Sequence, residues 1–344
     1  MTVEPGSFGK HAARSATYYT VSDHSYFLGT VAMINSLRLT GNAGEIVVLD
    51  RGLTGEQRRT LGSHCSIVRF EDARRTDIEQ HPFLVKPYPH LFGAHGNIVI
   101  IDSDMIVTQR FDSILDRIAS GRICAIEDPT LPKRWFAIWE TELELRAPLR
   151  RQTYANAGFI AFSTERWPDF LARWWDLCRI ILPRWVDDPE LPFHWLDQDA
   201  LNAMLMSEIP EDALELMPKS RAPAFEDLRE TRVADAGSLT SVLHDRPTLV
   251  LHNAGPIKPW DRRKWYRLQH NAYLELMPRV LSADDVPLRI RVEEVPVWLR
   301  AGTAPRVYRR SLTILSSAAR RTVRGLPPLT RFIRARFRAR RPGA

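Results

Sequence analysis

Two carboxylates that directly follow a very apolar stretch have the clearest capacity for chemistry. Ile98 to Ile101 are four consecutive β-branched residues, a pattern typical of a strand buried on both faces. Asp102 and Asp104 come immediately after it. Ligands of open α/β sheets bind outside the carboxyl ends of the strands, and carboxylate oxygens suit Mg²⁺ or Mn²⁺ bound together with substrate phosphates. The stretch predicts a metal–nucleotide site, although an Asp-x-Asp pair alone also fits a polar turn.

The elements that must position these carboxylates alternate between strand and helix. Other polar clusters adjoin strand ends at Ser22–Asp23, at Asn156–Gly158 and at His252. Short apolar strands separated by helical patterns are typical of βαβ units, so we expect an α/β fold with a mostly parallel central sheet flanked by helices. Strands are predicted at 17–21, 46–49, 67–70, 98–101, 122–126, 158–162 and 248–251, and helices at 27–37, 53–61, 165–182, 197–206 and 265–280.

The charge of the chain is unevenly distributed. Residues 306–344 contain twelve of the 48 basic residues and none of the 41 acidic ones, so the rest holds 36 basic against 41 acidic residues. This indicates a mildly acidic globular body with a basic tail. Three cysteines without metal spacing favour a reducing compartment, and neither a signal peptide nor a membrane-spanning run is visible.

A signature near the end of the body makes the metal–nucleotide interpretation specific. The segment from His252 to Trp260 reads His-x-x-Gly-x-x-Lys-Pro-Trp. It resembles the closing signature of the family 8 glycosyltransferases, which include glycogenin and bacterial lipooligosaccharide galactosyltransferases. The resemblance extends from about Thr17 to Trp265, and its parts occur in the family's order. It implies a GT-A glycosyltransferase fold with a Rossmann-like, mostly parallel sheet.

The resemblance also implies site residues. Asp102, Asp104 and His252 match the family's ligands for Mn²⁺ (or Mg²⁺). Asp197, Gln198 and Asp199 match the catalytic segment beneath the anomeric carbon. The remaining donor-binding positions, which would contact the base, the ribose, the diphosphate or the sugar, are Val21, Asp23, Tyr26, Lys86, Ser103, Asn156, Gly158, Gly255 and Lys258.

Several of these residues also have simpler interpretations. Asp197 could be the N-cap of the following helix, and Lys86 could be a solvated surface lysine. Trp135, Trp139 and Trp195 could stack on an acceptor sugar or pack within the protein.

The function that follows is metal-dependent transfer of a hexose, with retention of configuration, from a nucleotide diphosphate sugar, expected to be UDP-linked, to a saccharide or lipid-linked saccharide. Gln198 is a poor nucleophile, which favours front-face displacement, while Asp199 stays a candidate covalent participant. The alternatives are a sugar-nucleotide pyrophosphorylase, which would carry a Gly-rich loop after the first strand, and a non-catalytic nucleotide-sugar or nucleic-acid binding protein.

The tail completes the predicted organisation. Its arginines alternate with apolar residues such as Phe332 and Phe337, a composition that favours contact with an anionic membrane surface. A solvated disordered tail is an alternative, and nucleic-acid binding is less favoured because the body is acidic. We expect a disordered N-terminus (1–15), the transferase domain (16–265), a helical extension (266–300) and the tail (301–344), in a cytoplasmic protein bound peripherally at the inner face of the cell membrane.

Overall fold

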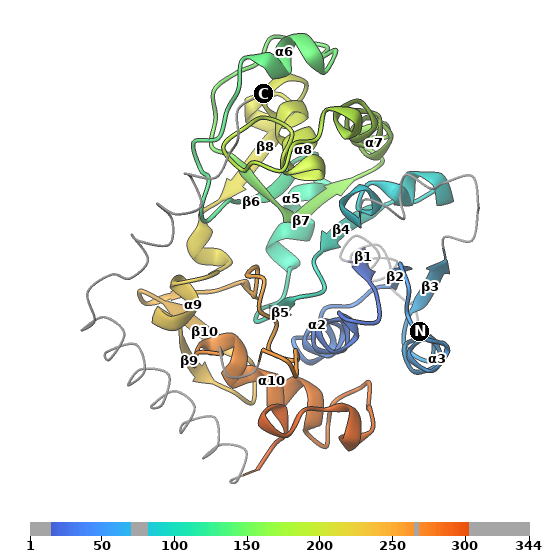
Figure 1. Ribbon diagram of the computed structural model, residues 1–344, viewed down its shortest axis with the longest axis vertical. Helices are drawn as coiled ribbons and strands as arrows, with labels where there is room; N and C mark the ends of the chain where they lie inside the picture. The colour runs from blue at the N-terminus through green and yellow to red at the C-terminus, as the bar shows by residue number, and fades with distance from the viewer. Residues whose placement is uncertain (1–14, 70–81, 265–267, 303–344) are drawn as a thin grey trace, which may run out of the picture.

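The computed structural model describes residues 15–69, 82–264 and 268–302 (Figure 1). The predicted disordered N-terminus and basic tail therefore lie almost wholly outside the described residues, as does the start of the helix predicted from Trp265. Within the described ranges, no helix has both the length and the apolar character needed to cross a membrane.

Within these ranges, seven strands form a central sheet in the order β3-β2-β1-β4-β7-β6-β8. Strand β7 runs antiparallel to its neighbours β4 and β6, and the other six strands run in one direction. The predicted mostly parallel sheet flanked by helices is confirmed. Its strands are β1 (Thr17–Ser22), β2 (Ile46–Asp50), β3 (Ser66–Arg69), β4 (Asn97–Ile101), β6 (Ile123–Glu127), β7 (Ala155–Ser163) and β8 (Leu214–Met217).

Strand β4 is buried on both faces, as its sequence predicts. Val99 and Ile101 pack into one apolar core, and Ile98 and Ile100 pack into a second core on the opposite face. Each fully buried side chain of this size contributes about 1.5–3 kcal/mol to folding. This packing fixes the position at which the strand ends and Asp102 begins.

Helices cover both faces of the sheet (Figure 1). The core on the first face includes α2 (Phe27–Leu39), α5 (Asp112–Ala119), α10 (Ala272–Ser282) and Leu61 of α3 (Gly55–Gly62). The second core includes α7 (Phe170–Ile181) and α8 (Leu196–Ser207). Helix α7 begins five residues later than predicted, after Pro168, since a proline disfavours helical geometry in the residue before it. Two short helices are α6 (Ile138–Glu142) and α9 (Asp227–Glu230).

Two smaller sheets complete the described part. Strand β5 (Met105–Val107) pairs antiparallel with β12 (Val250–His252), and His252 lies opposite Met105. This pairing brings the predicted third metal ligand next to the two aspartates. The other small sheet contains β9 (Arg232–Asp235), β10 (Thr240–Leu243) and β11 (Arg246–Pro247), none of which the sequence pattern predicted.

Candidate active site

The three predicted metal ligands lie together at the junction of β4, β5 and β12. Asp102, Ser103 and Asp104 form the turn between β4 and β5, in which the Met105 amide donates a hydrogen bond to the Asp102 carbonyl (3.1 Å). Nε2 of His252 lies 3.3 Å from Oδ1 of Asp104 and 3.8 Å from Oδ2 of Asp102. One ligand atom from each of these three residues, the ligand triad, lies within 4.8 Å of the others.

The chemistry of the ligand triad suits a divalent cation. Asp104 and His252 are buried, while the Asp102 side chain is 27% exposed. Two carboxylates and an imidazole match Mn²⁺ or Mg²⁺, and an ion held by so few protein groups keeps positions for diphosphate oxygens or water. The triad therefore fits the predicted kind of metal, and its composition leaves the choice of ion open.

A lysine accompanies each aspartate of the triad. Lys258 Nζ lies 2.6 Å from Oδ2 of Asp104, and Lys86 Nζ lies 3.0 Å from Oδ1 of Asp102. Burial alone would raise the pKa of Asp104, but Lys258 and His252 hold it well below its usual range. Burial disfavours the charged form of Lys86, yet Asp102 and Asp197 outweigh it and raise its pKa. Burial likewise opposes the charge of Lys258, but Asp104 raises its pKa, so both ammonium groups are charged at neutral pH.

Lys86 also joins the triad to the predicted catalytic segment. Its Nζ lies 3.3 Å from Oδ2 of Asp197, in the first turn of α8. Burial raises the pKa of Asp197 to about 6, a rise that Lys86 opposes and Asp102 reinforces. Asp197 lies two residues past the N-cap position, which Trp195 occupies, so it is not the N-cap residue. Lys86, for which the sequence allowed either a surface or a site position, has only 13% of its side chain exposed and lies between Asp102 and Asp197.

The carboxylate of Asp128, just beyond β6, orients two predicted residues and was missed by the sequence analysis. Its Oδ2 accepts hydrogen bonds from Nε2 of Gln198 (3.0 Å) and Nδ2 of Asn156 (3.1 Å). Oε1 of Gln198 accepts the Ala157 amide (2.9 Å). Both ends of the Gln198 side chain are thus held in place. The available signal was the position of Asp128 two residues after the strand predicted at 122–126, but no motif marks it.

Glycine is required at position 158 because a side chain would not fit there, not because the backbone adopts an unusual conformation. A Cβ at this position would lie 2.7 Å from Oδ2 of Asp102 and 2.7 Å from Oδ1 of Asn156. The Gly158 carbonyl also accepts the Asp102 amide (2.8 Å). The Asn-Ala-Gly segment therefore supports the Asp102–Asp104 turn directly.

Asp199 has a different environment from its neighbours in α8. Its side chain is fully buried, and Arg134 donates to both carboxylate oxygens, from Nε to Oδ1 (2.7 Å) and from Nη2 to Oδ2 (2.8 Å). The Tyr154 hydroxyl donates to Oδ1 (2.6 Å) and the Trp195 amide to Oδ2 (3.1 Å). With both oxygens saturated by protein donors, Asp199 is not presented as a nucleophile.

The end of β1 supplies the predicted base-binding residues. Oδ1 of Asp23 accepts the amides of Ser25 (2.7 Å) and Tyr26 (3.0 Å), which shapes the turn into α2. The ring of Tyr26 lies 5.3 Å from Nζ of Lys258. Val21 is partly buried in β1.

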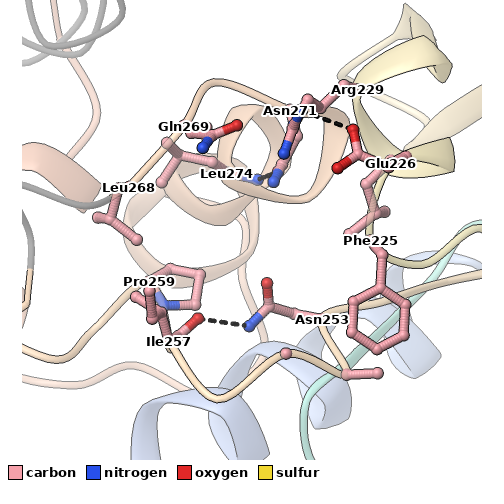
Figure 2. A pocket seen from close by; sticks show the side chains of 13 residues that line it. Phe225, Glu226, Arg229, Asn253, Ile257, Pro259, Leu268, Gln269, Asn271 and Leu274 are labelled. Carbon is pink, nitrogen blue, oxygen red and sulfur yellow. Dashed lines mark hydrogen bonds and ion pairs between the residues drawn. The ribbon is translucent and has the colours of Figure 1, made fainter. Parts of the chain in front are cut away.

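One cavity of about 460 Å³ brings most of these groups together. The predicted residues that line it are Tyr26, Lys86, Asp102, Asp104, Asn156, Asp197, Gln198, His252 and Lys258. Val21, Asp23, Ser103, Gly158 and Asp199 are not among its lining residues. Gly255 lies instead in an adjoining pocket of about 180 Å³ (Figure 2), whose wall includes Asn253, hydrogen-bonded to the Ile257 carbonyl.

The three tryptophans considered from the sequence differ in burial and in position relative to the cavity. Trp139 is fully buried in the second core, and the guanidinium of Arg151 lies 3.9 Å from the centre of the Trp135 ring. Trp195 lines the cavity, together with Trp185. Of the three, Trp195 is therefore the one placed to meet a ligand there.

Comparisons with known proteins found similar chains among solved structures only. Neither a protein-family model nor a curated protein matches the sequence. Among solved structures, the apo structure of WbbM, a bifunctional glycosyltransferase, is similar with a TM-score of 0.49 at 15% identity over 83% of this chain and 51% of that one. This chain thus spans about half the length of the WbbM structure.

Two further similar structures are of the galactosyltransferase LgtC. The LgtC complex with donor and acceptor sugar analogues has a TM-score of 0.47 at 15% identity, over 72% of this chain and 90% of that one. An active-site mutant of LgtC gives 0.47 at 16% identity over the same shares. WbbM and LgtC are both glycosyltransferases.

Proposed function

We propose that this protein is a metal-dependent glycosyltransferase that moves a hexose from a nucleotide diphosphate sugar, UDP-linked, to a saccharide or lipid-linked saccharide hydroxyl. One observation carries the proposal. A single cavity is lined by the ligand triad, by two charged lysines and by the oriented amide of Gln198. Cations for a diphosphate and polar groups for a sugar are what transfer from such a donor requires.

We assign the ligand triad and the two lysines different roles in the reaction. The ligand triad would hold a divalent cation, which supplies positive charge to the diphosphate leaving group. Lys258 and Lys86 offset the charge that develops on the diphosphate as the bond from the anomeric carbon to oxygen breaks. The electron pair of that bond leaves with the diphosphate.

Retention follows from attack on the face from which the donor oxygen leaves. The acceptor hydroxyl forms the new bond to the anomeric carbon, and its proton passes to the departing phosphate oxygen. Gln198, fixed by Asp128 and the Ala157 amide, orients the sugar. Asp197 lies beside Lys86 and adds negative charge near the developing positive charge of the sugar when it is ionised. The saturated carboxylate of Asp199 supports this route over a covalent one.

The test is turnover of a panel of nucleotide sugars, followed by release of the nucleotide diphosphate with Mn²⁺ or with EDTA. We expect one UDP-sugar to be hydrolysed slowly only with Mn²⁺, and Asp102→Asn to lower this rate by about 100-fold or more with the fold intact. Asp176→Asn, which changes an exposed aspartate of α7, is the matched control. Equal hydrolysis in EDTA, or by the Asp102→Asn variant, would exclude the proposed role of the metal.

A further inference from the structure

Three aromatic side chains form one wall of the cavity and are not used by the proposed chemistry. Trp185, His194 and Trp195, the aromatic wall, come from the segment that connects α7 to α8. The rings of Trp185 and His194 stack with centroids 6.4 Å apart, and His194 meets Trp195 edge to face at 4.6 Å. Trp185 is 41% and Trp195 39% exposed. The wall therefore presents apolar ring surface to the cavity that the polar groups of the site also line.

The aromatic wall is held in place by the buried ion pair described above. Arg134 donates from Nη1 to the Pro189 carbonyl (2.6 Å) and from Nη2 to the Leu191 carbonyl (2.6 Å), while it also binds Asp199. Asp199 in turn accepts the amide of Trp195. The Arg134–Asp199 pair thus ties the connecting segment to α8 at three backbone groups.

The backbone of this segment needs such support. Phe193 and Leu196 have φ angles of 72° and 29°, a left-handed region that side chains other than glycine rarely adopt. Such conformations persist where surrounding contacts enforce them. The rings are therefore fixed before any ligand binds, which lowers the entropic cost of binding.

The chemistry of the wall fits the ring face of a sugar. A pyranose has C–H groups on its ring faces and hydroxyl groups at its edge. An indole ring can cover the C–H face and remove its apolar surface from water. Asp187 and Thr130, which line the same cavity, offer oxygen atoms to the hydroxyl groups at the edge. The Trp195 carbonyl accepts the Gln198 amide (2.8 Å), so the wall continues directly into the first turn of α8, whereas the Tyr26 ring lies 5.3 Å from Nζ of Lys258.

We propose that the aromatic wall binds the ring of the saccharide acceptor, and that Asp199 acts through Arg134 as a positioning residue for this wall. The inference rests on the proposed glycosyltransferase function. It assigns recognition of the acceptor to the segment that connects α7 to α8. It also gives the buried carboxylate of Asp199 a positioning role.

The first test is saturation-transfer NMR with a panel of methyl hexopyranosides, on protein loaded with UDP and Mn²⁺. UDP binding is followed in the same samples by thermal shift, so failure of the proposed donor site is seen separately. We expect at least one glycoside to contact the wild-type protein, and Trp195→Ala and Trp185→Ala to raise its Kd about tenfold with UDP binding unchanged. Phe92→Ala, which removes an equally exposed aromatic ring outside the cavity, is the control. Absence of any contact in the wild type, or unchanged contacts in both tryptophan variants, would overturn the proposal.

The second test addresses the positioning role. Arg134→Lys keeps the charge but loses the fork that reaches Pro189, Leu191 and Asp199 together. We expect it to raise the glycoside Kd at least fivefold while the UDP Kd changes less than twofold. Arg173→Lys, in the Arg173–Glu208 pair, whose side chains are also largely buried, is the control and should leave the glycoside Kd unchanged. Equal weakening of glycoside and UDP, or no change in either, would show that the pair has a merely structural role. If Arg134→Lys fails to fold, Trp185→Ala, which changes an exposed side chain, still tests whether the aromatic wall binds the glycoside.

Discussion

At the scale of single residues, two buried carboxylates of the cavity have pKa values shifted in opposite directions. Burial raises the pKa of both, but Asp104 lies 2.6 Å from Lys258 and close to His252, which together outweigh it. Asp197 shares Lys86 with Asp102, so burial prevails and its pKa rises to about 6. The position of each lysine thus decides which carboxylate is strongly acidic.

This difference predicts a pH dependence of stability. Because the folded-state pKa of Asp197 is higher than the usual 3.8, its contribution is fully present below about pH 4 and is lost as the pH rises through about 6. We expect the free energy of unfolding of Asp197→Asn, relative to wild type, to increase by about 2 kcal/mol between pH 4 and pH 7. Urea unfolding in metal-free buffer measures it. A difference that is constant with pH would contradict the proposed electrostatic environment.

Two glycines near the ligand triad should respond differently to the same substitution. A Cβ at Gly158 would meet two side-chain oxygens at 2.7 Å, whereas at Gly255 the nearest atom is 3.9 Å away. We expect Gly158→Ala to cost about 1–3 kcal/mol and to weaken Mn²⁺ binding by displacing Asp102. Gly255→Ala should leave stability unchanged and weaken UDP alone, if the diphosphate approaches its backbone. Thermal unfolding and UDP titration distinguish the two variants. The same effect of both substitutions would contradict the different roles given to Gly158 and Gly255.

The sequence identified residues that belong to local patterns. Asp102, Asp104, His252 and Lys258 each stand in a motif, and the structure brings all four together. Arg134, like Asp128, was missed because its partner is 65 residues away in the chain and no spacing rule links them.

At the scale of elements, the backbone of α2 packs against the Asp102–Asp104 turn. A Cβ on Gly29 would lie 2.6 Å from the Ser103 carbonyl oxygen and 2.4 Å from the Trp260 ring. Trp260 also donates from Nε1 to the Ser25 carbonyl (2.7 Å). The helix therefore supports the site from behind, and glycine allows this close approach.

The contact reverses the usual effect of replacing a helical glycine. Alanine normally stabilises a helix interior by about 0.5–1 kcal/mol relative to glycine. We expect Gly29→Ala instead to destabilise by about 1–3 kcal/mol, because the carbonyl of Ser103 cannot move away freely. Gly62→Ala in α3, where the nearest atom is 3.8 Å away, is the control. Thermal unfolding measures both, and a stabilised Gly29→Ala would refute the close packing.

The sequence predicted elements with strong patterns and missed those without them. Strand β4 and helix α2 were predicted because runs of β-branched residues and regular apolar spacing are unambiguous signals. The direction of β7 depends on long-range pairing with β4 and β6, which leaves no local trace. Strands β9 to β11 are short and half-exposed, so their apolar pattern is weak.

At the scale of the whole molecule, the predicted helical extension packs into the main core. Asn35 of α2 donates from Nδ2 to the carbonyls of Val280 (2.7 Å) and Leu288 (2.9 Å) and accepts the Leu288 amide (2.8 Å). Helix α10 lies against α2 (Figure 1), and Tyr273, Leu276 and Met277 belong to the first core. Residues up to Leu288 therefore stabilise the helix that supports the site.

The uneven charge of the chain makes a separate prediction about the proposed membrane contact. Twelve arginines without acidic residues in 306–344 should each contribute about 1 kcal/mol on an anionic surface before screening. We expect the full chain to sediment with phosphatidylserine-containing vesicles at low salt and not with neutral phosphatidylcholine vesicles. A chain ending at residue 302 should lose this binding and keep donor hydrolysis. Equal binding to both kinds of vesicle, or none to either, would contradict the contact.

The most direct test of the central claim is calorimetric titration of UDP into the protein with and without Mn²⁺. The ligand triad and the two lysines should act together, so we expect UDP to bind at least about tenfold more tightly with Mn²⁺, and His252→Ala to remove this difference. Equal affinity with and without Mn²⁺, or no binding in either condition, would show that the cavity is not a metal–nucleotide site.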